Sequence, residues 1–227
     1  VSGDFYYMEF SQDKVIIAIA DCTGHGVPGA MMTSIGAAGL NNAILDKKMS
    51  DPGQILTHLD LYIKNALSAS SEDLTDGMDI GIIAFNYRNN EIEYCGAKRP
   101  LIIVKETGEV ETIPGIKRSI GEFSFGEDMT FQTTYYPFVN PISIYCFSDG
   151  VPDQFGGPKK KKLYLKKLIE FLAKNSKLDV KEQQEVLSQM ILDWTNDFET
   201  SQTDDMVLFG AKIEQKYFDK MSKIINL

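Results

Sequence analysis

Short strand-like segments separated by turn residues dominate the sequence and most limit its possible folds. Apolar or alternating runs of strand length occur at residues 5–10, 14–20, 79–86, 91–95, 101–105, 109–113, 129–136, 142–147 and 205–213. Gly, Asn and Asp residues interrupt these runs at the spacing of β-hairpins. The chain is therefore expected to build much of its core from hairpin-connected strands.

Helical patterns fall in blocks on either side of the central strands. Residues 30–45 are rich in small side chains, and a second helix is expected to begin at Asp51-Pro52. Two more are expected at residues 165–172 and 186–198, with a short helix in the tail. Because helices and hairpins come in separate blocks, we predict an α+β fold with antiparallel sheets rather than a βαβ alternation.

Composition and charge exclude several classes of protein. Hydrophobic residues make up 43% of the 227 residues and charged residues 24%, as in ordinary globular domains. No apolar stretch reaches the roughly 20 residues that cross a bilayer, so no membrane contact by this domain is expected. A net charge of −9 argues against a nucleic acid partner. The three cysteines, Cys22, Cys95 and Cys146, are not spaced as paired ligands and predict reduced thiols in a cytoplasmic setting.

Aspartates stand where strand-like segments give way to turns. Asp4 lies at the first strand, Asp21 ends the second, Asp149 follows residues 142–147, and Asp204 precedes the last strand. Neighbouring glycines leave such carboxylates room to reach a shared point, and Mg²⁺ and Mn²⁺ prefer oxygen ligands of this kind. Gathered carboxylates repel one another unless cations are bound. Each aspartate alone is more simply a turn former or a helix cap, but the set predicts a cation site.

Five motifs occur in the order seen in one enzyme family. They are Gly3-Asp4-Phe5-Tyr6, Ala20-Asp21-x-x-Gly24-His25-Gly26-Val27-Pro28, Gly77-Met78-Asp79-Ile80, Ser148-Asp149-Gly150-Val151-x-Asp153 and Asp204-Asp205-Met206. In these motifs the chain resembles, from end to end, the SpoIIE-like branch of the metal-dependent (PPM-type, PP2C-like) serine/threonine protein phosphatases. The resemblance implies a four-layer α/β/β/α sandwich in which helices flank two central antiparallel sheets. It also implies two Mn²⁺ or Mg²⁺ ions at one edge of the sandwich.

The resemblance gives the principal aspartates their expected roles as metal ligands and catalytic residues. It implies that Asp21 contacts both ions, assisted by the backbone carbonyl of Cys22. Asp4 is then expected on one ion, and Asp149 and Asp204 on the other. A water shared by the two ions would become a hydroxide that attacks phosphorus in line, while the ions offset charge on the phosphoryl group.

Further candidates lie outside these principal positions. Asp79 and Asp153 are the candidates for a weaker third metal ion. His25 is offset from the catalytic histidine of animal-type relatives, where this chain has Thr23, so bracing of the glycine turn is expected ahead of proton donation. Arg99, one of only three arginines, is a candidate for binding the substrate phosphate.

The function that the resemblance implies is a serine/threonine phosphatase acting on a phosphoprotein in bacterial signalling. Relatives often dephosphorylate anti-sigma-factor antagonists. Because the chain opens at Val1 without Met, we expect residues 1–227 to be a single domain excised from a longer protein with an N-terminal sensor or regulatory region. The expected location is the cytoplasm, either free or as the cytoplasmic domain of a membrane-anchored receptor, and a homodimer is left open.

Two other classes compete with the enzyme. The first is a catalytically silent module that keeps the fold and acts in partner switching, but the four principal ligand positions are all retained. The second is an acidic calcium-binding protein, but no EF-hand spacing is present. A basic cluster at residues 159–162, with Lys166 and Lys167, is expected to be a solvated helix face, with docking of an acidic partner as the alternative.

Overall fold

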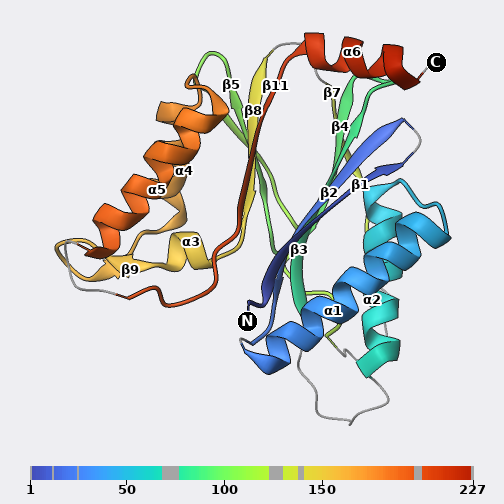
Figure 1. The fold of residues 1–227 in the computed structure, drawn as a ribbon, viewed down its shortest axis with the longest axis horizontal. Helices are drawn as coiled ribbons and strands as arrows, with labels where there is room; N and C mark the ends of the chain where they lie inside the picture. Colours follow the sequence, from blue (N-terminus) through green and yellow to red (C-terminus); the bar gives the residue numbers. More distant parts are fainter. Residues whose placement is uncertain are drawn as a thin grey trace.

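The computed structural model describes residues 2–11, 13–24, 26–67, 77–122, 130–137, 141–196 and 201–225, except for the side chains of residues 196 and 221–225. Two antiparallel sheets pack face to face, and helices cover the outer face of each (Figure 1). The predicted four-layer sandwich is confirmed. No helix in the described ranges is long and apolar enough to cross a membrane.

The first sheet has five strands in the order β1-β2-β3-β4-β7. Its strands are β1 (Asp4–Ser11), β2 (Lys14–Cys22), β3 (Met78–Asn86), β4 (Glu91–Ala97) and β7 (Thr134–Pro137). Its outer face is covered by α1 (Val27–Asn41), the π-helical turn η1 (Asn42–Asp46) that continues it, and α2 (Pro52–Leu67). Pro28 lies in the first turn of α1, where its missing N–H leaves no hydrogen bond unmade.

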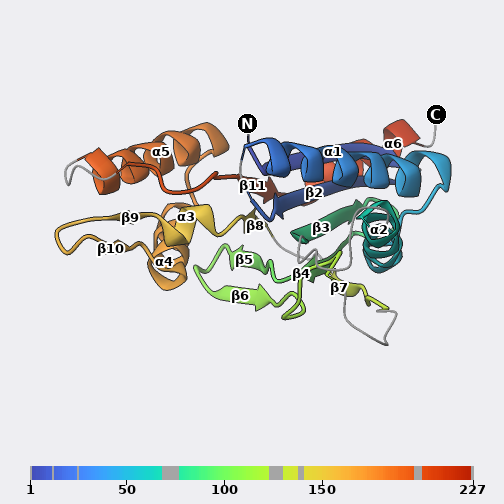
Figure 2. The same ribbon diagram turned by 90° about the horizontal axis from the view of Figure 1, so that it is seen from below.

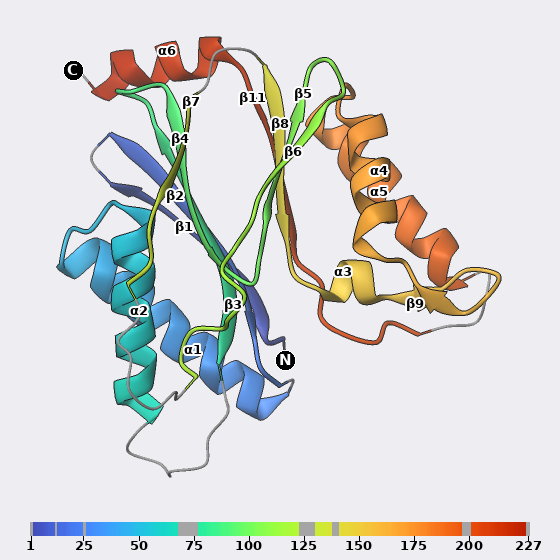
Figure 3. The same cartoon turned by 180° about the vertical axis from the view of Figure 1, so that it is seen from behind.

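The second sheet has four strands in the order β11-β8-β5-β6. They are β5 (Leu101–Lys105), β6 (Val110–Ile113), β8 (Ile142–Phe147) and β11 (Leu208–Ile213), and the helices α4 (Leu165–Asn175) and α5 (Val180–Asn196) cover them. The helix α6 (Gln215–Ile225) lies across one end of the sandwich (Figure 3). The short helix α3 (Gly150–Asp153) and the hairpin of β9 (Phe155–Gly156) and β10 (Lys161–Lys162) lie beside α4, away from α1 and α2 (Figure 2).

Three layers of buried side chains separate the four layers of backbone. The strand β2 shows how its sequence serves two of them, because side chains alternate between the faces of a strand. Ile16 and Ala18 face the helices α1 and α2, whereas Ile17 and Ile19 face the second sheet. Complete burial of an Ile or Leu side chain stabilises the fold by ~1.5–3 kcal/mol. The alternation therefore fixes which face each residue of β2 presents.

The structure differs from the sequence prediction in several segments. Residue 129 of the strand predicted at residues 129–136 lies outside the described residues, and the strand begins only at Thr134. The described residues before Thr134 instead contact α2 and the residue before it. There Thr133 Oγ1 donates to Asp51 Oδ2 and accepts from the backbone N–H of Gly53, both at 2.8 Å. The last strand begins at Leu208 rather than at residue 205, and α5 begins six residues earlier than predicted. The helix α3 and the β9–β10 hairpin were not predicted.

Candidate functional site

Three aspartates form a row across one end of the first sheet. Asp4 at the start of β1 pairs in register with Asp21 near the end of β2. Asp21 in turn pairs with Asp79 near the start of β3. Residues directly opposite each other on antiparallel strands carry their side chains on the same face, with Cβ atoms about 5 Å apart. Because Ile19 faces the second sheet, the register directs this row of carboxyl groups to the same side.

The second sheet contributes Asp149, which follows β8 and immediately precedes α3. Gly150 is required there, because a Cβ at that position would overlap the backbone carbonyl oxygen of Asp205. Asp205 Oδ2 accepts a hydrogen bond of 2.9 Å from the backbone N–H of Gly3. Exposed Asp204 accepts a 2.9 Å hydrogen bond from the backbone N–H of Asp205 through its own Oδ1. The segment before β11 is therefore fastened to the start of β1.

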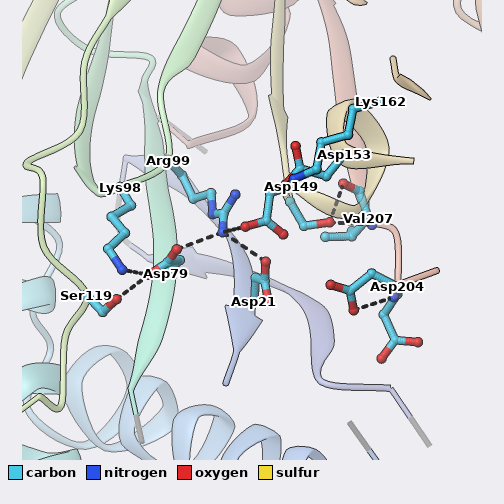
Figure 4. A network of polar contacts seen from close by, with 12 residues as sticks. Asp21, Asp79, Lys98, Arg99, Ser119, Asp149, Asp153, Lys162, Asp204 and Val207 are labelled. Carbon is cyan, nitrogen blue, oxygen red and sulfur yellow. Dashed lines mark hydrogen bonds and ion pairs between the residues drawn. The ribbon is translucent and has the colours of Figure 1, made fainter. Parts of the chain in front are cut away.

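Arg99 lies among the carboxylates (Figure 4). It follows β4 directly after Lys98, whose positive φ of 55° turns the chain back toward the site. Its Nη2 atom lies 2.9 Å from Asp21 Oδ2, 2.7 Å from Asp79 Oδ2 and 3.0 Å from Asp149 Oδ2. The side chain is only 8% exposed. Arg99 thus joins two strands of the first sheet to the end of β8, and we call Asp4, Asp21, Asp79, Asp149 and Arg99 the aspartate cluster.

Asp79 has partners that the other aspartates lack. Ser119 Oγ donates a hydrogen bond of 2.5 Å to Asp79 Oδ1, and Lys98 Nζ lies 3.6 Å from the same oxygen. Asp153 instead forms an ion pair with Lys162, at 2.7 Å. The two candidates for a third ion are therefore held by different parts of the chain.

Burial and mutual repulsion shift the proton affinities of the cluster. Burial raises the pKa of Asp21 to about 8, helped by the charges of Asp4 and Asp149 and opposed by Arg99. Burial also raises the pKa of Asp4, and the charges of Asp205 and Asp204 add to this. Burial alone would raise the pKa of Asp149 as well, but the Arg99 guanidinium outweighs it and holds that pKa below its usual range. The cluster therefore has a deficit of positive charge.

The donor set suits a divalent cation. Asp4 Oδ2 is buried and has no hydrogen-bond partner in the structure. Buried polar atoms without partners are rare in proteins and often indicate an ion or a water. The backbone carbonyl of Cys22 lies beside Gly3. A Cβ atom added to Gly3 would lie 3.1 Å from the Cys22 carbonyl oxygen. Carboxylate and carbonyl oxygens of this kind are the ligands of Mg²⁺ and Mn²⁺.

The side chains are not arranged around an ion as they stand. Within the described ranges, no three His, Cys, Asp or Glu side chains are spaced as ligands of one metal. Figure 4 shows the Arg99 guanidinium between Asp21, Asp79 and Asp149, in contact with all three carboxylates. His25, a candidate from the sequence, lies outside the described residues.

Among the solved structures with this architecture are three PP2C-type phosphatase domains. The SiaA-PP2C domain of Pseudomonas aeruginosa superimposes with a TM-score of 0.84 and 29% identity, over 94% of this chain and 82% of that one. The PP2C phosphatase domain of SpoIIE from Bacillus subtilis, solved with a fragment of its regulatory domain, gives 0.70 and 18%, over 94% and 59%. The catalytic domain of the serine/threonine phosphatase PstP, in complex with two manganese ions, gives 0.64 and 14%, over 94% and 93%.

The sequence comparison identifies the family within this class. The family model described as Stage II sporulation protein E (SpoIIE) matches residues 11–214. A search of curated proteins found no match. The chain belongs to the SpoIIE family and has the fold of PP2C-like phosphatase domains.

Several contacts at the site were not predicted from the sequence. Arg99 was identified as a candidate for phosphate binding, but its contacts with three carboxylates were not, and Ser119 and Asp205 were not singled out at all. One signal was available for Arg99. It follows the strand β4, whose end lies against the start of β3, where Asp79 stands. A basic residue at that edge of the sheet is well placed to reach the row of aspartates.

Proposed function

We propose that this domain is a metal-dependent protein phosphatase that hydrolyses phosphoserine or phosphothreonine on a signalling protein. One observation carries the proposal: Asp4, Asp21 and Asp79 form a row on the first sheet, and Asp149 of the second sheet meets them through Arg99. The buried, unpartnered Asp4 Oδ2 supports it. Membership of the SpoIIE family supports the reaction class.

The proposed ligands come from both sheets. Asp21 would contact two ions together with the Cys22 carbonyl, Asp4 would hold one of them, and Asp149 and Asp204 the other. Two bound divalent ions supply charge neutralisation of the phosphoryl group and activation of water near neutral pH. Asp79 and Asp153 remain the proposed positions for a third, weaker ion.

The chain's own residues then position the reactants. The contacts of Ser119 and Lys98 with Asp79 fix the third aspartate of the row. Lys98 is 44% exposed at its side chain, so its ammonium group can also attract an anionic phosphoryl group from solvent. The hydrogen bond from the Gly3 N–H to Asp205 joins the segment before β1 to the segment before β11, and so fixes the position of one sheet relative to the other at the site.

The proposed partners are a phosphoprotein substrate and an upstream regulatory region. The Bacillus subtilis SpoIIE structure, which contains part of a regulatory domain, supports such an arrangement. We propose an anti-sigma-factor antagonist or a similar partner-switching protein as the substrate, and the cytoplasm as the location.

The direct test is phosphate release from a phosphoserine peptide and a phosphothreonine peptide, with Mn²⁺, with Mg²⁺ and with excess chelator. We expect release only with metal, and loss of release in Asp4→Asn. Asp13→Asn is the matched control, because Asp13 lies in the turn between β1 and β2 and pairs with exposed Arg88. Release that survives complete chelation would contradict the metal-dependent mechanism.

The silent binding module is the alternative, and Arg99 is the observation that favours it. A buried arginine already offsets part of the charge of the aspartates, so the fold is held together there without a metal. Absence of both metal binding and phosphate release in the intact domain would support this alternative over the enzyme.

A further inference from the structure

Three carboxylate oxygens surround a single nitrogen atom of Arg99. The oxygens of Asp21, Asp79 and Asp149 all lie 2.7–3.0 Å from Nη2. A terminal guanidinium nitrogen carries two hydrogens. One carboxylate therefore has no hydrogen of its own and is held by charge alone or by a shared hydrogen. Several oxygens gathered around one point suit a cation better than a two-hydrogen donor.

The rest of the guanidinium is incompletely satisfied. Arg99 Nε is buried and has no hydrogen-bond partner in the structure. Solvent cannot easily supply the missing partner, because the Arg99 side chain is only 8% exposed and the residue is buried. Buried arginines are usually fixed by paired, bidentate contacts with a carboxylate. Arg99 lacks that arrangement, so a divalent cation can displace its guanidinium from the carboxylates of the cluster.

The same three carboxylates are also proposed metal ligands, Asp21 and Asp149 for the two principal ions and Asp79 only for the weaker third ion. Asp21 and Asp149 cannot present the same lone pairs to Arg99 and to a divalent ion at the same time. We propose that Arg99 is an internal counter-ion that occupies the centre in the metal-free protein and leaves Asp21 and Asp149 when a divalent ion binds. Competition of this kind lowers the apparent metal affinity by the fraction of molecules in which the arginine blocks the site.

Asp79 is the position at which Arg99 remains after the exchange. Its Oδ2 makes the shortest of the three contacts, at 2.7 Å. Ser119 already fixes its other oxygen, and Asp79 is not among the four principal metal ligands. A small movement of the guanidinium toward Asp79 therefore frees Asp21 and Asp149 without leaving a buried cation unpaired. This inference rests on the proposed metal centre but not on catalytic turnover.

The first test measures Mn²⁺ binding by calorimetry in wild type, Arg99→Gln and Arg88→Gln. Arg88 is the matched control, because it pairs with Asp13 outside the cluster and is 74% exposed. We expect Arg99→Gln to bind Mn²⁺ at least about tenfold more tightly than wild type, and Arg88→Gln to be unchanged. In chelator, Arg99→Gln should have a lower Tm than wild type and should gain more from added Mn²⁺. Equal or weaker Mn²⁺ affinity in folded Arg99→Gln would overturn the proposal.

The second test uses wild type and remains informative if Arg99→Gln does not fold. The chain has three arginines, so their side-chain N–H signals can be followed by NMR and assigned with Arg99→Lys and Arg88→Lys. We expect diamagnetic Mg²⁺ to shift the Arg99 signal in step with metal binding and to leave the Arg88 signal in place. Metal binding with an unchanged Arg99 signal would overturn the inference. Metal binding with the Arg99 shift but no phosphate release would reject only the proposed function.

Discussion

Two groups of buried charge lie at opposite ends of the first sheet, and they are built differently. At one end Glu93 of β4 is 2% exposed at its side chain, and both of its oxygens have partners. Lys14 Nζ lies 2.7 Å from one oxygen, and the Asn86 amide donates to the other at 2.9 Å. At the other end the aspartate cluster sets one guanidinium against several carboxyl groups and leaves Asp4 Oδ2 without a partner.

This difference distinguishes a structural ion pair from a site that can bind a further cation. Breaking a complete pair leaves a buried charge without compensation, which is strongly destabilising. An incomplete cluster already carries such a penalty, and a bound cation relieves it. The Lys14–Glu93 pair should therefore matter for stability alone, and the aspartate cluster for activity and metal binding. Each of the following experiments tests that division.

The largest effect is expected from Asp21→Asn. The substitution keeps the shape of the side chain but removes the charge of the proposed shared ligand. We expect phosphate release to fall at least about a thousandfold, equivalent to ~4 kcal/mol in the activation barrier. Excess Mn²⁺ should partly restore Asp79→Asn by mass action but should not restore Asp21→Asn. A folded Asp21→Asn protein with near-normal Mn²⁺ affinity and turnover would disprove the assignment.

Lys14→Met should reduce stability and leave the site intact. It leaves the Glu93 carboxylate buried and without its cation, for which a loss of ~3 kcal/mol is expected. In a domain of this size Tm falls by ~2–4 °C for each kcal/mol. Urea denaturation and Mn²⁺ calorimetry on the same samples measure both properties. Lys216→Met, which removes an exposed lysine beside Glu214, is the control and should not change Tm measurably; an equally small change in Lys14→Met would remove the contrast.

The stability of the metal-free protein should depend on pH through Asp21. Its pKa in the fold is about 8, above the usual 3.8, so the folded state binds this proton more tightly than the unfolded state does. The stabilisation is complete below about pH 4 and is lost as pH rises toward 8. Solvent reaches a fifth of the side chain, so we expect a loss on the order of 1–2 kcal/mol across this range. Burial also raises the pKa of Asp4, so urea titrations in chelator should show a steeper slope in wild type than in Asp21→Asn; equal slopes would contradict the role of Asp21.

The smallest effect is expected from Lys162→Gln. Lys162 and Asp153 form an ion pair in which both side chains are well exposed, at 39% and 47%, and such pairs add little to stability. We expect an unchanged Tm and unchanged binding of the two tight Mn²⁺ ions. A third, weaker ion should bind somewhat better, because Asp153 is released from its lysine. A clear loss of stability would place this pair with Lys14–Glu93 instead.

Local patterns were enough to predict most of the strands and helices, whereas the four-layer sandwich was implied by the family resemblance. The hairpin of β1 and β2, the helix α2 and the strand β8 all follow from alternation, capping residues and runs of apolar residues. The segment before Thr134 could not be predicted in this way, because its residues carry strand-like side chains but make hydrogen bonds with α2, some 80 residues earlier. Contacts over such distances in the chain leave no periodic signal.

The candidate site divides in the same way. Asp4 and Asp21 stand near the ends of strands that pair in sequence, so their positions at the strand ends already predicted that they would meet. Asp79 was a candidate only through the family resemblance, and its place beside Asp21 comes from the pairing of β2 with β3. The contacts of Arg99 join residues 20 to 78 positions apart, and they depend on a turn at Lys98 with a positive φ that a lysine rarely adopts. The hydrogen bond between Gly3 and Asp205 spans almost the whole chain. Sequence reasoning found the aspartates and named Arg99, but it did not predict the contacts through which Arg99 holds them.

The two-sheet origin of the cluster has a mechanical consequence. Asp4, Asp21 and Asp79 move with one sheet and Asp149 with the other, and the layer of side chains between the sheets is apolar. Such a layer resists separation, but its dispersion contacts have no fixed direction, so polar contacts such as that of Gly3 with Asp205 add to the resistance against sliding. A cation bound by carboxylates of both sheets therefore restrains the sliding of one sheet along the other. Amide hydrogen exchange should slow in β2 and β8 together when it binds, and any force that slides one sheet along the other should loosen it.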